Sequence, residues 1–334
     1  MKRILKIFLL ALIPCGCMHK ENTLIRKFPD EELLWPVKTV HFDPLKTNIM
    51  TIDYATDGLW VCKLVHGGEN CFAVINTDLD IIAKFGKEGR GPDEFNTPFF
   101  SGFNSLTGDS LSVNIRDWSM GRLYNVSVCL SDGGTSTTLL KDFGKPMRAV
   151  YPLGENFYLC NGDNNRYYFA GPDGKTEYLE GWDEEFNEAV ENNEWFIPDN
   201  QTSQVLSENG SALYVYSLAF PIIYKHSIED GRLMNKKILF HNQKQLIKEQ
   251  ISAYFQVAGF YNGHFIAFYR EERAGDADKN RLLVFDRDLN PVIAYNVENM
   301  NDFAINSDSG LMMAVNYDEE LIRYYDMSTI DDKL

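Results

Sequence analysis

A pattern of about fifty residues recurs six times along this chain of 334 residues. Each unit contains a glycine turn followed by a run of apolar and aromatic residues, as in "TDGLWVCKLV" (56–65) and "YNGHFIAFY" (261–269). A second strand-like run, a polar turn and a third run follow, and a short run precedes each glycine, so that a unit supplies four strands. The turn glycines lie 46 to 56 residues apart and are Gly58, Gly108, Gly154, Gly210, Gly263 and Gly310.

This repeat predicts an all-β fold: a six-bladed β-propeller of four-stranded antiparallel blades over residues 35–334. The last unit lacks a fourth strand, whereas an unassigned strand, residues 37–42, precedes the first unit. We therefore expect residues 37–42 to pair with residues 321–326 and to close the ring, which leaves no unpaired blade. Two β-sandwiches or another large all-β fold are the alternative. Helical periodicity is rare, and its best case is residues 242–255.

The chain begins with basic residues, a short apolar run from Ile7 to Ile13 and small residues before Cys17. This order is typical of a secretory signal, and the run is shorter than the roughly 20 apolar residues that span a bilayer. Gly16 and Cys17 are similar to a lipobox, in which the cysteine is lipidated after cleavage. We predict a signal over residues 1–17, lipidation at Cys17 and a tether over residues 18–34. The lipid would be the membrane anchor, and secretion of a soluble product is the alternative.

The net charge of −16 argues against nucleic acid as a partner, because nucleic acids attract basic surfaces. Neither a Cys-x-x-Cys motif nor the cysteine and histidine spacing of a zinc site is present, and we predict no metal and no cofactor. Cys62 and Cys71 flank "HGGE", and a hairpin turn centred on His66 and Gly67 would place them directly opposite each other. This spacing fits either a disulfide or two half-buried thiols.

The segment "FGKEGRGPDEF" (85–95) joins the first and second units. It is not a P-loop, because Glu88 rather than Ser or Thr follows Lys87, and its glycine spacing does not match a dinucleotide fingerprint. We interpret it as a braced connector between blades. Its Arg90 would pair with Asp93 or Glu94, or would contact a ligand carboxylate.

The turns of an antiparallel blade alternate between its two ends, which sorts the loops into two faces. The glycine turns share one face with the third-to-fourth strand turns. The blade-to-blade connectors and the second-to-third strand turns share the opposite face, which we call the connector face. Aromatic rings beside Arg, Asn and Asp are typical of a sugar or peptide site, although each residue alone can also be a packing residue or a solvated charge. The ligand-binding candidates on this face are Arg90, Asp93, Glu94, Arg116, Trp118, Arg148, Arg166, Trp182, Trp195, His241 and Arg270.

The string "FGxxGxGPxEF" after the first unit, behind a lipoprotein-type signal, resembles the TolB-like six-bladed propeller lipoproteins of Gram-negative gut bacteria. The resemblance implies a propeller fold and a location in the bacterial cell envelope, lipid-anchored to the outer membrane and facing the periplasm or the surface. It implies a binding or scaffolding role and transfers no catalytic residues.

Neither GxSxG nor HExxH occurs, and kinase and EF-hand patterns are also missing. We therefore expect a non-enzymatic, membrane-anchored domain that binds a glycan, a peptide or an envelope protein. A propeller lyase or hydrolase acting on a glycan or peptide, with carboxylates, Arg90 and His241 as participants, is the alternative. A third hypothesis is a scaffold that docks through residues 242–255.

Overall fold

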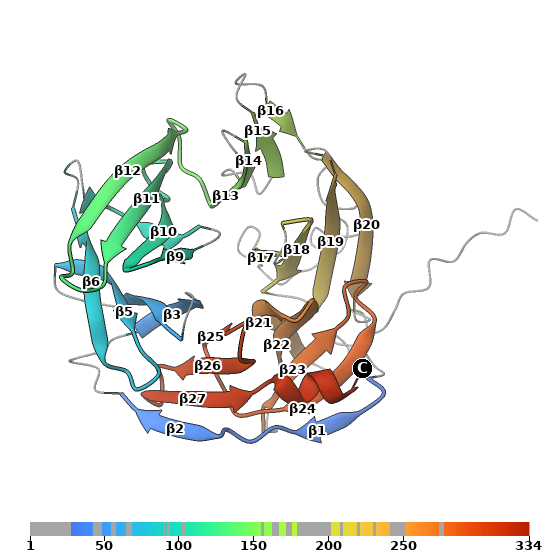
Figure 1. Ribbon diagram of the computed structural model, residues 1–334. Helices are drawn as coiled ribbons and strands as arrows, with labels where there is room; N and C mark the ends of the chain where they lie inside the picture. Colours follow the sequence, from blue (N-terminus) through green and yellow to red (C-terminus); the bar gives the residue numbers. More distant parts are fainter. Residues whose placement is uncertain are drawn as a thin grey trace, which may run out of the picture.

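Six β-sheets surround a central axis in the protein (Figure 1). The computed structural model describes residues 28–42, 49–54, 58–64, 69–89, 91, 94–101, 104–154, 157–161, 167–171, 176–178, 202–207, 210–218, 221–229, 232–240, 251–273 and 277–333. The predicted six-bladed β-propeller is confirmed. A short 3₁₀ helix, Ser328–Lys333, follows the last strand. None of the helices in these ranges has the length and apolar character to cross a membrane.

The first three blades follow one another along the chain, each running from an inner strand beside the axis to an outer strand. Blade 1 consists of β3 (Ile49–Tyr54), β4 (Trp60–Leu64), β5 (Asn70–Ile75) and β6 (Ile81–Glu88), with the short β7 (Glu94–Phe95) parallel to β6. Blade 2 consists of β8 (Pro98–Phe100), β9 (Ser105–Thr107), β10 (Ser110–Asp117), β11 (Arg122–Cys129) and β12 (Thr135–Asp142). Blade 3 consists of β13 (Ala149–Gly154), β14 (Phe157–Asn161), β15 (Tyr167–Ala170) and β16 (Thr176–Tyr178).

The remaining blades complete the ring. Blade 4 consists of β17 (Thr202–Leu206), β18 (Ala212–Ser217), β19 (Ile222–Glu229) and β20 (Arg232–Phe240). Blade 5 consists of β21 (Ile251–Tyr261), β22 (His264–Arg273), β23 (Lys279–Phe285) and β24 (Pro291–Asn296), with β1 (Glu31–Leu33) parallel to β24. Because β1 lies within the predicted tether of residues 18–34, the propeller begins before the predicted boundary at residue 35. Blade 6 consists of β25 (Asp302–Ile305), β26 (Leu311–Asn316), β27 (Leu321–Asp326) and the early strand β2 (Lys38–His41).

The ring closes through β2, as the strand count predicts. β2 runs antiparallel to β27, with Thr39 opposite Arg323 and His41 opposite Leu321. The chain therefore supplies the outer strand of blade 6 before it enters blade 1, and the two ends of the propeller are joined by backbone hydrogen bonds. Figure 1 shows β1 and β2 along the outer edge of blades 5 and 6.

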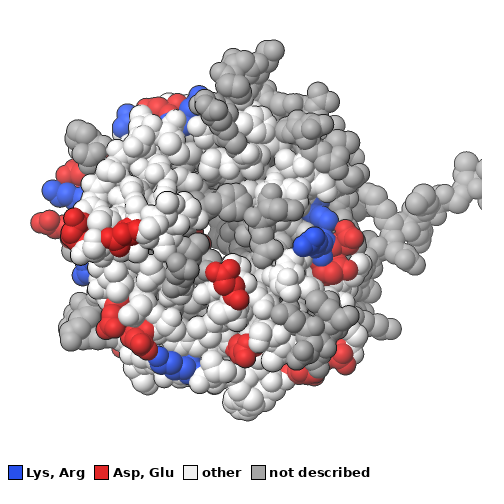
Figure 2. Space-filling model, viewed as in Figure 1, with Lys and Arg blue, Asp and Glu red and all other residues white. Residues whose placement is uncertain are grey.

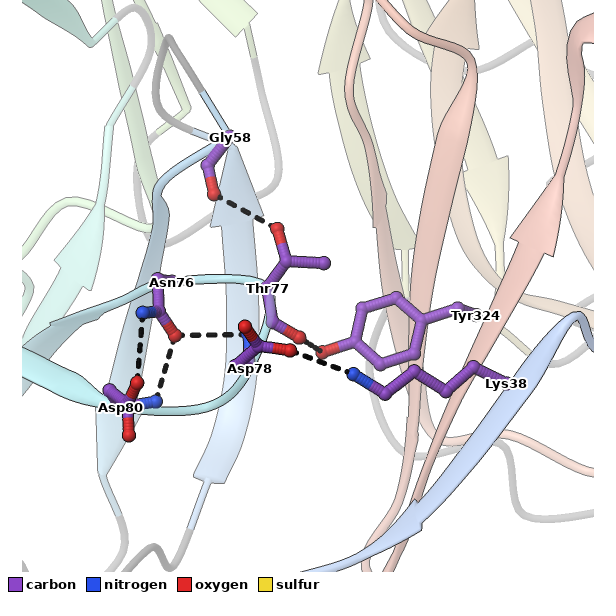
Figure 3. A network of polar contacts seen from close by, with 7 residues as sticks. All are labelled: Lys38, Gly58, Asn76, Thr77, Asp78, Asp80 and Tyr324. Carbon is purple, nitrogen blue, oxygen red and sulfur yellow. Dashed lines mark hydrogen bonds and ion pairs between the residues drawn. The ribbon is translucent and has the colours of Figure 1, made fainter.

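Polar contacts tie blade 6 to blade 1 beside this closure (Figure 3). The Tyr324 hydroxyl donates to the Thr77 carbonyl at 2.8 Å, and Lys38 Nζ lies 3.1 Å from Asp78 Oδ1. Thr77 and Asp78 belong to the β5–β6 turn. Asn76 Oδ1 fixes this turn by accepting the backbone N–H groups of Asp78 and Asp80.

The same turn recurs in blade 5. Asp286 Oδ1 accepts the backbone N–H groups of Asp288 and Asn290, both at 2.8 Å. Leu289 has a φ of 61°, a conformation that a leucine adopts only where its surroundings fix it, and its side chain is fully buried. These repeated units thus share this hydrogen-bonded turn as well as their strands.

The hydrophobic core is divided among the contacts between neighbouring blades. One cluster joins blades 6 and 1 and includes Trp60, Ile322 and Tyr324, while another joins blades 1 and 2 and includes Phe72 and Val113. Because blades press on both faces of a central sheet, strands such as β5 are buried on both sides. This explains why the sequence shows apolar runs rather than strict alternation.

Two sequence predictions are wrong in detail. Residues 251–255, the end of the predicted helix 242–255, belong to strand β21; residues 242–250 lie outside the described residues. Ala253 and Phe255 are buried while Ser252 is exposed, so the apolar positions there follow a strand period of two.

The second error concerns the cysteine pair. The β4–β5 register places Cys62 opposite Ala73, so that the hairpin is centred one residue later than predicted and Cys71 is not opposite Cys62. Both thiols are free and buried. Burial raises the pKa of Cys62, and it raises the pKa of Cys71 to about 11. Of the two interpretations, a disulfide or two half-buried thiols, the structure has two unpaired thiols, which are buried rather than half-buried.

Candidate functional site

A cavity of about 440 Å³ occupies the centre of the ring. Its wall is built by the inner strands, and each of the six blades contributes to it. The lining residues are Ile52, Asp53, Phe100, Asn104, Tyr151, Gln204, Val205, Leu206, Val257, Ala258, Gly259, Phe260, Asp302, Phe303, Ala304, Ile305 and Ser307. Figure 2 looks along the ring axis and shows acidic side chains near the centre and around the rim of this face.

Polar side chains reach this cavity from five different blades. They are Asp53, Asn104, Tyr151, Gln204 and Asp302. An inner strand has a hydrogen-bonded neighbour on one side only, and its other edge borders the channel. Polar side chains are therefore tolerated there without the cost of placing them between packed blades. Blade 5 contributes instead the apolar stretch from Val257 to Phe260.

Irregular strands help to shape this wall. The inner edge of blade 2 is broken into β8 and β9, which both pair with β10, and Asn104 lies in the break between them. In blade 5 the pairing of β21 shifts between Phe255 and Val257. Such bulges commonly re-aim side chains beside functional sites.

Asp302 is the most perturbed acid of the cavity. Its Oδ2 accepts the Ile52 N–H at 2.8 Å, and its Oδ1 accepts the Phe303 N–H at 3.0 Å. Burial raises the pKa of this carboxyl to about 7, and the nearby Asp53 adds to the rise, whereas the two backbone N–H groups oppose it. Asp302 therefore exchanges a proton near neutral pH, which is a property of functional carboxyls in clefts.

The neighbouring polar groups are linked by hydrogen bonds. Asn104 Nδ2 lies 3.3 Å from Asp53 Oδ2, and the Tyr151 hydroxyl donates to the Gln204 carbonyl at 3.1 Å. Burial raises the pKa of Tyr151, so that the phenol stays neutral. A ligand in this cavity could therefore contact carboxyl, amide and phenol groups of the protein beside the aromatic residues Phe100, Phe260 and Phe303.

This arrangement suits binding of a ligand with hydroxyl or amino groups, because carboxyl and amide oxygens accept their hydrogen bonds and aromatic faces cover their apolar parts. Within the described ranges, no cluster of three or more His, Cys, Asp and Glu side chains could hold a metal ion.

The predicted connector-face residues are distributed over several blades. Glu94 closes the connector on itself: its Oε2 accepts the Gly91 N–H at 2.8 Å, and its Oε1 lies 3.5 Å from Lys87 Nζ. Arg90, Asp93, Arg166, Trp182, Trp195 and His241 lie outside the described residues.

The described basic candidates differ in their partners. Arg270, near the end of β22, lies 2.7 Å from both Glu272 and Asp278, so that its charge is already matched. Arg148 is half-buried just before β13, and its backbone N–H donates to the Asn161 carbonyl at 2.8 Å.

Arg116 and Trp118 lie at the β10 end of blade 2. Trp118 is 39% exposed in the β10–β11 turn. Arg116 Nη1 donates to the Met147 carbonyl at 3.2 Å, and its guanidinium lies over the Phe99 ring. Burial lowers the pKa of Arg116 to about 10. The structure thus brings Glu94, Arg116 and Trp118 to blades 1 and 2, far along the ring from Arg270 in blade 5.

Sequence reasoning missed the channel residues. A signal was present, because polar residues interrupt the short runs that precede the glycine turns, as Asp53 does in "MTIDYA" and Gln204 in "QTSQVL". These runs form the inner strands, so that such a residue points to the wall of the channel.

Comparison with solved structures identifies the fold. The β-propeller domain of Cps50 (Swd1) from Myceliophteria thermophila is 11% identical with a TM-score of 0.50, and the match covers 88% of this chain and 99% of that domain. One chain of a S. cerevisiae complex of Dbp5 with Nup159, Gle1, IP6 and ADP is also 11% identical, with a TM-score of 0.46 and coverage of 91% and 98%. No family model and no curated protein matches this chain. The likeness shows the β-propeller fold alone.

Proposed function

We propose that this protein is a non-enzymatic binding protein of the bacterial cell envelope, anchored through a lipid on Cys17, and that its central channel takes the ligand. The observation that carries this proposal is the cavity of about 440 Å³ to which five blades each present a polar side chain. Its volume falls within the range of roughly 300–1,000 Å³ that small-molecule sites occupy. β-Propeller domains commonly bind proteins or ligands.

The chemistry of the wall points to a glycan or peptide end with hydroxyl or amino groups. Asp302 is bonded to backbone N–H groups, and none of the ion pairs within the described ranges involves it. An amino group would therefore supply the cation that this carboxyl lacks, and a hydroxyl group would donate to it. The rings of Phe260 and Phe303 would cover the apolar face of the same ligand.

The position of the N-terminal strands supports anchoring through a tether. Phe28 packs against Phe285 in blade 5, and β1 and β2 lie on the outer edge of blades 5 and 6 (Figure 1). The chain therefore enters the propeller at its rim rather than across the channel. The lipobox-like Cys17 and the resemblance to TolB-like propeller lipoproteins support the envelope location. Metabolic labelling with a radioactive fatty acid tests it, because a Cys17→Ala variant should lose the label.

Calorimetric titration of the processed protein against glycans and short peptides tests the channel. For a ligand that binds, Asp302→Asn and Tyr151→Phe should weaken binding by about tenfold each, the effect of losing roughly one hydrogen bond to a charged or buried group. The matched control is Trp118→Ala on the connector face, which should bind as the wild type does. The opposite result, with Trp118→Ala weakened and the channel variants unchanged, would move the ligand to the connector face.

The alternative of a lyase or hydrolase rests on one observation, the Asp302 carboxyl with a pKa raised to about 7 beside Asp53. A carboxyl that holds a proton near neutral pH is suited to general acid catalysis. Product analysis of each bound glycan or peptide separates the two functions. Cleavage that disappears in Asp302→Asn would establish the enzyme, whereas an intact ligand recovered after prolonged incubation supports binding alone.

A further inference from the structure

A second group of charged side chains lies between blades 1 and 2. Lys63 Nζ is 3.7 Å from the centroid of the Phe99 ring, and the Arg116 guanidinium carbon is 4.7 Å from the same centroid. The three residues come from β4, β8 and β10, and the register places Phe99 directly opposite Arg116. Two cations therefore share one aromatic ring near the ends of strands that lead to the connector face.

Neither cation has a carboxylate partner among the residues that the structure describes. The one hydrogen bond of Arg116 goes to the Met147 carbonyl, which leaves further guanidinium N–H donors available, and Lys63 takes part in no ion pair there. The nearby acid Asp117 is engaged elsewhere, because its carboxylate accepts the backbone N–H groups of Asn96 and Thr97. This is unusual in a chain in which 48 acidic residues outnumber 32 basic ones.

Bringing the two cations together is unfavourable in the unliganded protein. Burial lowers the pKa of Arg116 to about 10, and burial together with the charge of Arg116 lowers the pKa of Lys63. An aromatic face attracts a cation but compensates only part of the loss of water and of the mutual repulsion. A bound anion would remove both costs.

We propose that Lys63, Phe99 and Arg116 form an oxyanion-binding site that takes a carboxylate or phosphate group of a ligand. The planar guanidinium can bond two oxygens of such a group side by side, and the ammonium adds a point charge. The site is separate from the cavity of the proposed function, whose wall contains none of these three residues. Its test therefore does not depend on the identity of the channel ligand.

Thermal unfolding of the processed protein in sodium phosphate, sodium glucuronate and sodium chloride at equal ionic strength tests the site. One of the two oxyanions, at about ten times its dissociation constant, should raise the wild-type melting temperature by roughly 3 °C over chloride. A larger shift with glucuronate identifies a carboxylate ligand, and a larger shift with phosphate identifies a phosphoryl ligand. Equal melting temperatures in all three salts would overturn the proposal.

Lys63→Met and Arg116→Met should each lose this shift and melt within about 2 °C of the wild type in chloride, because each variant removes one of two repelling charges. Lys145→Met is the matched control, since the Lys145 ammonium also lies over an aromatic ring, that of Tyr168 at 5.1 Å, and Lys145 is not part of the cluster around Phe99. It should keep the full shift. Variants that melt much earlier in chloride and still respond to the oxyanion would show that the cluster is purely structural.

A measurement on the unaltered protein guards against variants that fail to fold. With lysine labelled by carbon-13, the side-chain signal of Lys63 reports its pKa by NMR. Addition of the effective oxyanion should raise this pKa, whereas the side-chain signal of Lys145 should not respond. Equal responses of the two lysines would reject a specific site.

Discussion

Two arginines in different blades, Arg323 and Arg116, have opposite surroundings. Arg323, in β27 of blade 6, is 7% exposed; it forms ion pairs with Glu298 and with Glu319, and it donates to the Asn299 carbonyl at 3.1 Å. Arg116, in β10 of blade 2, contacts the Phe99 ring and one carbonyl, and no carboxylate of the described chain pairs with it. Arg323 therefore uses its guanidinium in contacts within the protein, whereas Arg116 has guanidinium N–H donors left for a ligand.

Asp302 extends this contrast to an acid. It lies at the inner edge of the same blade as Arg323, and its carboxyl is bonded to backbone N–H groups rather than to a cation. The charge of Arg323 is thus balanced by two carboxylates, whereas Asp302 and Arg116 take part in no ion pair among the described residues. A charge without a partner lowers the stability of the folded protein, and such destabilising groups are common at sites that bind ligands.

The largest expected effect is the replacement of Arg323. Arg323→Met leaves the half-exposed carboxylates of Glu298 and Glu319 without their cation and the Asn299 carbonyl without its donor, and we expect a loss of about 2 kcal/mol in the free energy of unfolding. Arg116→Met should change it by no more than about 1 kcal/mol, because the Met147 carbonyl loses one hydrogen bond but the repulsion of Lys63 is relieved and no described carboxylate loses a partner. Urea denaturation of both variants measures the difference. Similar losses of unfolding free energy in the two variants would contradict the difference between Arg323 and Arg116.

The pH dependence of stability sharpens the contrast for Asp302. Its pKa is about 7 in the folded protein and has the ordinary value of 3.8 when unfolded, so that between these values the folded state holds a proton that the unfolded chain releases. Stability should therefore fall as the pH rises from 4 to 7, by about 2 kcal/mol after allowance for the water that reaches a half-buried side chain.

Asp302→Asn should lack this part of the pH dependence, and Asp78→Asn, at an exposed turn, should retain it. Denaturation curves at several pH values give the difference between the variant and the wild type, in which the contributions of other carboxyls cancel. A parallel pH dependence for Asp302→Asn and the wild type would show that Asp302 is not perturbed.

A smaller effect is expected at the junction of blades 6 and 1. Tyr324→Phe removes the hydrogen bond to the Thr77 carbonyl and leaves that carbonyl beside a buried ring, which should cost about 1 kcal/mol. Urea denaturation measures this loss, and hydrogen exchange should show faster exchange in β2 and β27. Unchanged exchange in these two strands would mean that the contact does not hold the ring closed.

The smallest effect is expected for Lys38→Met. The Lys38 and Asp78 side chains are 45% and 78% exposed, and exposed pairs contribute less than about 1 kcal/mol. The variant should unfold within about 0.5 kcal/mol of the wild type, and the small difference should vanish in high salt. A loss as large as that of Arg323→Met would contradict the distinction between exposed and buried charges.

Sequence reasoning predicted the blades correctly because each depends on local features. A glycine such as Gly263, with a φ of 76°, marks a turn that most residues cannot adopt, and the apolar runs around it form strands. The closing strand was predictable as well, since the number of strands left one place in blade 6 and one segment to fill it.

The errors concern features that depend on exact register or distant contacts. Gly67 and Gly68 both suit a hairpin turn, and a shift of its centre by one residue separates Cys62 from Cys71 in the pairing. Residues 251–255 carry a pattern that fits a helix as well as a strand, and pairing with β22 decides between them. The channel site was missed because its parts are far apart: the Ile52 N–H and the Asp302 carboxylate meet across 250 residues.

The sequence by itself determined the repeat, the strands, the turns and the order of the blades, because turn geometry and apolar periodicity act over a few neighbouring residues. Only the tertiary structure decided which charges are balanced. Arg323, Arg116 and Asp302 are similar in sequence in that each is a charged residue with an apolar residue on at least one side. Packing within and between blades brought two carboxylates to the first, an aromatic ring and a second cation to the next, and backbone N–H groups to the last. Electrostatic energies depend on distances and burial, and these are set only when distant segments pack together.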